Sequence, residues 1–141
     1  MKRKLVMAGI LVTAVMAAAC GARGAKPSTP SAAASVRPSS PARISILSPH
    51  NGQTIRSRSL PIHLSLKNAR IVKPTTSNIN PRKGHIHVSL DGSIVSMNYG
   101  LKDTIHNLSP GTHTLRVEFV ASDHLPFNPR VFQEVAFVVK P

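Results

Sequence analysis

The sequence predicts an all-β protein, a sandwich of two antiparallel sheets with about seven short strands, preceded by a signal peptide and a disordered linker. Two observations after residue 42 predict the sandwich. Apolar and polar residues alternate in short segments, as they do in half-buried strands. Clusters of Pro, Gly, Asn and Ser separate these segments, and none shows the period of an amphipathic helix. Two packed sheets are the arrangement that buries one face of each strand.

The chain begins with the pattern of a secretory signal peptide, which we assign to residues 1–19. A basic tip, Lys2-Arg3-Lys4, precedes a run of apolar or small residues from 5 to 19. This run is shorter than the roughly 20 residues that a membrane-spanning helix needs. We therefore expect the rest of the protein outside the cytoplasm.

Cys20 is the only cysteine of the sequence, so no internal disulfide can form. Three alanines precede it and Gly21 follows, which resembles the lipobox of bacterial lipoproteins. The resemblance implies that Cys20 is the lipidation site, carrying acyl chains such as palmitate. It also implies a lipid anchor on the extracytoplasmic face of a membrane in a bacterial cell envelope. A plain signal peptide cleaved at an Ala-x-Ala site is the alternative.

Residues 20–42 are predicted to be a disordered linker behind the lipidated cysteine. From residue 21 the segment is rich in Ala, Ser and Pro and contains neither an acid nor an aromatic residue. Such a composition buries too little apolar surface to offset the entropy of ordering. Its prolines favour extended conformations, and its basic residues can rest on anionic headgroups.

Residues 43–141 have the length of one small domain. They contain 12 of the 18 Lys and Arg and all five acids, a formal charge of +7. Because the protein is expected to be exported, we expect an envelope protein or an anionic polymer as its partner. Nucleic acid is not expected, since basic and aromatic residues do not interleave as they do where bases stack. The expected state is a monomer.

The expected strands follow from alternation and from the turns between them. A turn cluster at 48–52 separates the first two, and a long loop is expected from 68 to 83, where periodicity is weak. Asp91-Gly92 is typical of a two-residue hairpin turn. In chain order, the expected strands are 44–47, 60–67, 84–90, 94–99, 102–106, 113–121 and 131–139.

The segment Leu-Ser-Pro-Gly-Thr-His-Thr-Leu, residues 108–115, resembles the turn and sixth strand of bacterial immunoglobulin-like and fibronectin type III-like domains. The resemblance implies an immunoglobulin-like sandwich in which strands 84–90 and 113–121 are antiparallel neighbours. In such folds a side chain near this turn bonds back to the turn backbone, as in a tyrosine corner. His113 lies two residues before Leu115, so both side chains point inward. We therefore expect His113 to have this structural role of bonding to the turn backbone.

Three motifs together resemble a family of uncharacterised bacterial exported domains with a Gly-His-x-His strand. They are Gly84-His85-Ile86-His87, the segment 111–115 and Asp123-His124-Leu125-Pro126. This resemblance implies a fold and a compartment, but no activity. Exported sandwiches with a histidine-bearing loop are also distantly similar to periplasmic copper-resistance proteins, which implies metal handling as an alternative function.

A metal site is predicted where the histidine motifs meet. Alternation places His85 and His87 on one strand face, roughly 6.5–7 Å apart at Cα, so both imidazoles can reach one ion. Antiparallel pairing brings the loop with Asp123 and His124 to the same end. We therefore expect a surface cluster of His85, His87 and His124 for Cu(II) or Zn(II), with Asp123 as a fourth ligand or an outer partner. The alternative is that the two strand histidines are exposed polar positions without a ligand.

Two further features bear on this site. A regular hairpin around Asp91-Gly92 pairs Ile86 with Met97, so we expect Met97 to point into the core, although a one-residue bulge reverses this. Without an outward methionine or thiolate, a dedicated Cu(I) site is not expected. Basic residues near the site (Arg82, Lys83 and Arg116) repel a cation and favour an anion-binding surface instead.

An enzyme is not expected. The five acids are scattered, and the sequence contains no Gly-x-Ser-x-Gly elbow, phosphate-binding glycine loop or His-Glu-x-x-His motif. The expected function is a membrane-tethered, extracytoplasmic binding or accessory module without catalytic activity. The alternative is an extracytoplasmic copper- or zinc-binding protein, and Cu(II) or Zn(II) is the only cofactor considered.

Overall fold

The computed structural model describes residues 36–73 and 75–140, which form nine β-strands and no helix. The predicted signal peptide, the lipidation site Cys20 and most of the linker lie outside the described residues. Among the described residues, no helix could cross a membrane. The strands are β1 (Arg43–Ser48), β2 (Gln53–Ile55), β3 (Leu60–Lys67), β4 (Arg70–Ile71), β5 (Lys83–Leu90), β6 (Ser93–Asn98), β7 (Lys102–Ile105), β8 (Gly111–Ala121) and β9 (Pro126–Val139).

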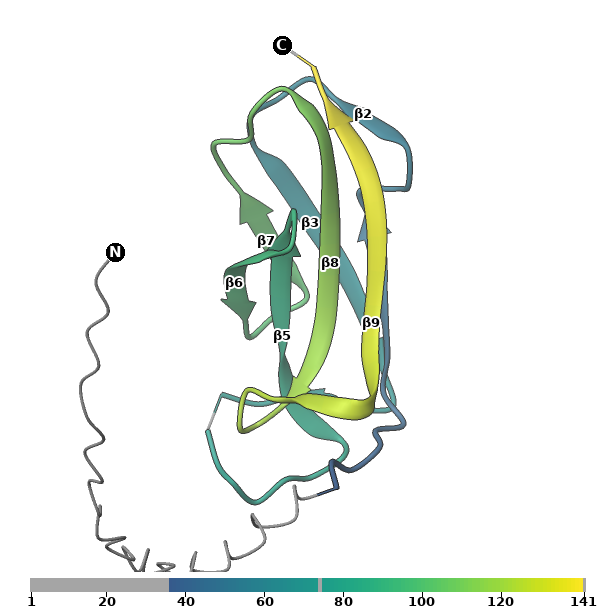
Figure 1. The fold of residues 1–141 in the computed structure, drawn as a ribbon, viewed down its shortest axis with the longest axis vertical. Helices are drawn as coiled ribbons and strands as arrows, with labels where there is room; N and C mark the ends of the chain where they lie inside the picture. Colours follow the sequence, from purple (N-terminus) through teal and green to yellow (C-terminus); the bar gives the residue numbers. More distant parts are fainter. Residues whose placement is uncertain (1–35, 74, 141) are drawn as a thin grey trace, which may run out of the picture. The chain divides into compact units, whose positions relative to one another are not determined.

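The strands form two sheets (Figure 1). One sheet has the order β1-β3-β7, and the other has the order β2-β9-β8-β5-β4, with β6 also paired to β5. Several neighbouring strands come from distant parts of the chain, as in a Greek-key sandwich: β3 pairs with β7, β8 pairs with β5, and β2 pairs with β9. This strand order is that of an immunoglobulin-like sandwich. The predicted all-β, immunoglobulin-like fold is therefore confirmed.

The core lies between the inner faces of the two sheets. The long strands β1, β3, β5, β8 and β9 contribute alternate residues to it, because successive side chains of a strand point to opposite faces. Burying each large apolar side chain contributes about 1.5–3 kcal/mol. The largest fully buried side chains of the core are Leu60, Ile62, Ile86, Val88, Leu108, Leu115, Val117, Phe119, Phe127 and Phe137.

All seven expected strands are present, and two short ones are additional. β2 has three residues and β4 has two, too few for an alternating pattern to show. β9 also begins earlier than expected, at Pro126. Val131 pairs with Phe119 but Pro126 pairs with Val120, so the residues between them bulge out of the ladder. Phe127 uses this bulge to enter the core, where its ring stacks on that of Phe119.

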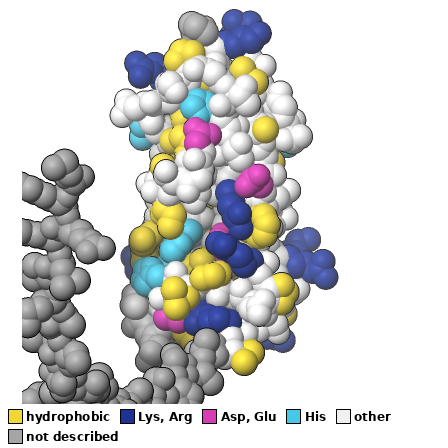
Figure 2. Space-filling view, in the orientation of Figure 1, with side chains coloured by type: hydrophobic (Ala, Val, Ile, Leu, Met, Phe, Trp, Pro, Cys, Tyr) yellow, Lys and Arg dark blue, Asp and Glu magenta, His cyan; other side chains and the backbone are white. Residues whose placement is uncertain are grey.

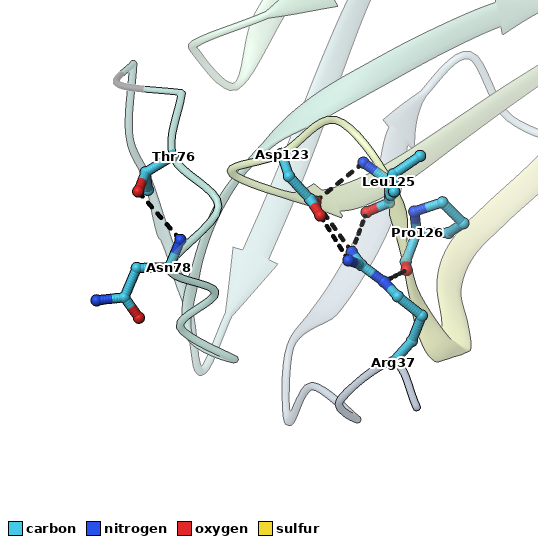
Figure 3. Close-up of polar contacts among 6 residues, drawn as sticks. All are labelled: Arg37, Thr76, Asn78, Asp123, Leu125 and Pro126. Atoms are coloured by element: carbon cyan, nitrogen blue, oxygen red, sulfur yellow. Dashed lines mark hydrogen bonds and ion pairs between the residues drawn. The ribbon is translucent and has the colours of Figure 1, made fainter. Parts of the chain in front are cut away.

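The folded part of the chain begins before Arg43. The guanidinium of Arg37 donates hydrogen bonds to the carboxylate of Asp123 and to two backbone carbonyls of the same turn (Figure 3). The carbonyl of Pro38 accepts a bond from the backbone N–H of Asn128, and Ala42 is buried. Residues 37–42, expected to belong to the disordered linker, therefore pack on the domain. Most of these contacts are polar, and Ala42 is the one apolar side chain of the segment in the core, so apolar composition does not reveal them.

The β5–β6 hairpin differs from its predicted register. Asp91 and Gly92 form the turn with positive φ, and Leu90 faces Ser93 as expected. The ladder then shifts by one residue, so that Met97 faces His87 instead of Ile86. The expectation that Met97 points into the core is wrong, and its side chain is 50% exposed. Since β6 lies off the main path of the sheet and its side chains are exposed or only half-buried, burial does not enforce its register.

Candidate metal centre

Two histidines of β5 point away from the core but are nearly inaccessible to solvent. Ile86 and Val88 occupy the inner face, so His85 and His87 lie on the outer face of the sheet. Their exposed fractions are nevertheless only 2% and 8%. Neighbouring side chains cover them, including Tyr99, whose ring centre is 5.4 Å from that of His85. They are therefore not the solvated polar positions that the alternative interpretation required.

The glycine before these histidines allows β5 to approach β8 closely. Gly84 pairs with Ala121, and a Cβ added at Gly84 would lie 1.9 Å from the carbonyl oxygen of Val120. Any other residue here would push the two strands apart. The glycine thus holds His85 next to the end of β8, from which the turn to β9 begins.

That turn carries the third histidine. The N–H of His124 donates to the carbonyl of Ala121, and the N–H of Ala121 donates to the carbonyl of Leu125. His124 has φ of 65°, in the left-handed region that residues other than glycine seldom adopt. The tight turn aims its ring back at β5. Its Nδ1 lies 2.9 Å from Nε2 of His85, and its Nε2 lies 3.1 Å from Oγ1 of Thr75.

The three imidazoles present ring nitrogens to one point. Nε2 of His85 is 3.2 Å from Nε2 of His87, and the three facing nitrogens all lie within 4.8 Å of one another. In a tetrahedral zinc site, nitrogens about 2.0–2.1 Å from the ion are about 3.3 Å apart. The 3.2 Å distance matches this spacing and the 2.9 Å distance between His85 and His124 is slightly shorter, so only the gap between His87 and His124 has to narrow. Figure 2 shows histidine side chains gathered on this face of the sheet, with basic and hydrophobic side chains beside them.

The surroundings favour neutral imidazoles at the centre. Burial lowers the pKa of His85 to about 4, and the neighbouring His124 and His87 add to this effect. Burial and His124 also lower the pKa of His87, although Glu118 acts in the opposite direction. A neutral imidazole keeps the lone pair that a metal ion requires. Both strand histidines are therefore in the state suited to coordination at neutral pH.

Asp123 does not join the three histidines, which corrects the expectation of a fourth, carboxylate ligand. Nη1 of Arg37 lies 2.5 Å from Oδ2 of Asp123, and Nη2 lies 3.0 Å from Oδ1 (Figure 3). The hydrogen bonds from Arg37 lower the pKa of this carboxyl group. The same carboxylate accepts the N–H of Leu125, so it fixes the turn on either side of His124. Asp123 therefore acts on the centre through the backbone.

Glu118 also belongs to the site, although the sequence does not predict it there. It faces His87 across the β5–β8 ladder and is buried. Arg130 binds both of its oxygens, at 2.7 and 2.5 Å, and Arg116 lies 3.9 Å away. One sequence feature could have indicated this: Glu118 lies two residues after Arg116, so both side chains are on the outer face of β8. The arginines neutralise this carboxylate, so the histidine nitrogens are the groups left to bind a metal ion.

His113 lies at the other end of β5 and β8. Its Nδ1 donates to Oδ2 of Asp91 at 2.7 Å, and its Nε2 donates to the carbonyl oxygen of Ser109 at 2.9 Å. These two hydrogen bonds raise the pKa of His113. The hydroxyl of Ser109 is 3.5 Å from Nε2, but that nitrogen already donates to the carbonyl. This Ser, His and Asp group therefore ties the hairpin to the turn before β8 and offers no base to activate the serine.

Comparison with known proteins yields a likeness of fold. No protein-family model matches the sequence, and no curated protein matches it. A solved structure of fibronectin(III)-like modules of CbhA from Clostridium thermocellum matches with a TM-score of 0.48 and 13% sequence identity. The match covers 69% of this chain and 96% of that chain. The class of the protein, an immunoglobulin-like β-sandwich, is defined by the strand order of its two sheets.

Proposed function

We propose that this domain is a non-catalytic metal-binding module of a bacterial cell envelope, which holds Cu(II) or Zn(II) on His85, His87 and His124. One observation carries the proposal: three ring nitrogens from two elements lie within 4.8 Å of one another. Imidazole nitrogen is a preferred ligand of both ions. Three protein ligands leave a further position for a fourth donor.

The hydrogen bond between His124 and Thr75 supports this function. Histidines that bind metals usually donate their other ring N–H to a polar group, which fixes the tautomer and the ring orientation. If Nε2 of His124 donates to Oγ1 of Thr75, Nδ1 carries the lone pair and faces His85. While no ion is bound, the same tautomer lets Nδ1 of His124 accept a hydrogen bond from Nε2 of His85, so the ring keeps its orientation.

The proposed location follows from the N-terminal pattern. A signal peptide over residues 1–19 and acylation of Cys20 would hold the domain at the extracytoplasmic face of a membrane. The segment from residue 21 to 35 would then separate the lipid from the folded part. Metal ions in this compartment reach the centre without crossing a membrane.

An envelope partner or anionic polymer is the second candidate, because the domain is basic. Arg116 and Arg130 line a groove of about 430 Å³ on the outer face, next to His87 and His124. Both guanidinium groups, however, are already close to the carboxylate of Glu118. Glu118 therefore offsets one of the two positive charges that an anion would need, and the metal function has the stronger support.

Calorimetric titration of the full chain in detergent with Cu(II) and Zn(II) tests the proposal. We expect one tight site per chain, lost in the double variant His87→Ala/His124→Ala. His63→Ala is the matched control, since His63 is exposed on β3 in the other sheet. Equal affinity of the wild type and the double variant would refute the metal function and leave the polymer or partner as the better explanation.

A further inference from the structure

We propose that Met97 supplies a thioether ligand to the three-histidine centre, and that the centre therefore holds copper as Cu(I) as well as Cu(II). This inference rests on the proposed metal function and goes further, since it names the metal and one more ligand. It reverses the expectation from the sequence, which placed Met97 in the core.

The register of the β5–β6 hairpin carries the inference. Met97 is directly opposite His87 in this ladder. Directly opposite residues of antiparallel strands share one face, with Cβ atoms about 4.5–5.5 Å apart. A methionine side chain is unbranched, with several rotatable bonds, so its sulfur can turn toward the neighbouring imidazole. A ladder without the shift would place Met97 on the inner face, where it could not reach the histidines.

Tyr99 shows that side chains from this part of the chain reach the cluster. It follows Met97 by two residues, next to the end of β6, and its ring centre is 5.4 Å from that of His85. Met97 and Tyr99 thus flank the two strand histidines from the side opposite β8. His124 approaches from the β8–β9 turn, so a sulfur from β6 would add a donor from a different direction.

The ligand chemistry favours copper over zinc. A thioether is a soft donor that selects Cu(I), whereas zinc sites in proteins use thiolate, imidazole and carboxylate. The only cysteine of the sequence is Cys20, so Met97 is the sole sulfur outside the N-terminal 20 residues. Three imidazoles and one thioether are all neutral, and they place no negative charge on the ion.

The charges around the cluster point the same way. The nearest carboxylates are Asp123 and Glu118, and arginines bind both through paired hydrogen bonds. With neutral ligands, a bound Zn(II) keeps two positive charges and a bound Cu(I) keeps one. The repulsion from a nearby guanidinium scales with the charge of the ion. A basic, carboxylate-poor setting therefore penalises a divalent ion more than Cu(I).

A competition titration tests this inference. The full chain in detergent is titrated with Cu(I) under anaerobic, reducing conditions against a chromogenic Cu(I) chelator, and separately with Zn(II). Met97→Leu keeps the size and the apolar character of an exposed side chain, so it should fold. We expect it to lower the Cu(I) affinity by about tenfold or more and to leave the Zn(II) affinity within about twofold. Ile94→Leu, on the same strand and similarly exposed, is the control and should change neither affinity.

X-ray absorption at the copper edge gives a second readout. The wild type loaded with Cu(I) should show a sulfur neighbour that Met97→Leu lacks. If the variant binds Cu(I) as tightly as the wild type, or the wild type shows no sulfur neighbour, Met97 is not a ligand and this inference is wrong. If His87→Ala/His124→Ala still lowers Zn(II) and Cu(II) binding in that case, the proposed function survives. If neither Met97→Leu nor His87→Ala/His124→Ala weakens the binding of any of these ions, both the inference and the proposed function are refuted.

Discussion

Arg37 and Asp123 form a two-pronged ion pair that joins the chain before β1 to the turn carrying His124. The two residues are 86 positions apart in the sequence. Nε and Nη2 of the same guanidinium also donate to the carbonyls of Pro126 and Leu125. One side chain therefore fixes the carboxylate and the backbone of the turn together. The segment that leads toward the proposed membrane anchor thus contacts the proposed metal centre through this turn.

Arg37→Ala should weaken metal binding as well as the fold. We expect a loss of about 1 kcal/mol of stability, because both side chains of the pair are partly exposed, and a clear drop in Zn(II) and Cu(II) affinity, because the turn is no longer fixed. Thermal unfolding with and without metal measures both effects. Arg43→Ala, an exposed position at the start of β1, is the control. A variant that loses stability but binds metal normally would show that the ion pair does not position His124.

Gly84→Ala should destabilise the domain where β5 meets β8. The added Cβ would clash with the carbonyl oxygen of Val120, which is backbone and cannot rotate away. We expect a loss of about 1–3 kcal/mol in urea unfolding and weaker metal binding, because His85 moves with its strand. Gly100→Ala is the matched control, since nothing lies closer than 3.5 Å to a Cβ at that position. Equal stability of both variants would mean that β5 shifts without cost.

Much of the candidate site follows from the period of a strand. Alternation alone places His85 and His87 on one face. Successive side chains of a strand point to opposite faces, so these two residues point outward when Ile86 and Val88 point into the core. The antiparallel pairing implied by the family resemblance then brings His124 to the same end. These steps depend on burial of one sheet face, a strong constraint on register.

Two parts of the site do not follow from local pattern. The one-residue shift that turns Met97 outward occurs in an edge strand, where no core enforces a register. The contact between Arg37 and Asp123 joins residues without any local relationship, and it converts an expected ligand into a support of the turn. A contact between residues so far apart in the sequence depends on the folded backbone, so composition and spacing do not predict it.

The ion pair of His113 and Asp91 should make the domain less stable as the pH rises above neutral. Hydrogen bonds to Asp91 and Ser109 raise the pKa of His113 in the folded state above its ordinary value of 6.5. The folded protein then binds the proton more tightly than the unfolded chain does. This contribution is complete below pH 6.5 and is lost as the pH rises through the folded pKa. Urea unfolding from pH 6 to 9 measures the loss, and Asp91→Asn should flatten it; an unchanged slope in the variant would contradict the assignment.

The metal-free histidine cluster should have the opposite pH dependence. Burial first, and then the neighbouring histidines, lower the pKa of His85 from 6.5 to about 4. Between these pH values the unfolded chain therefore binds a proton at His85 that the folded protein does not bind. Stability is therefore present above pH 6.5 and declines as the pH falls from 6.5 toward 4. Urea unfolding of the chelator-treated full chain at several pH values in this window should show the decline, and His85→Gln should reduce it. His106→Gln, whose ring contacts Ser59 far from the cluster, is the control and should keep the slope of the wild type. A metal-free protein that is equally stable at pH 7 and pH 4.5 would mean that His85 titrates normally and that its ring is not held in the buried cluster.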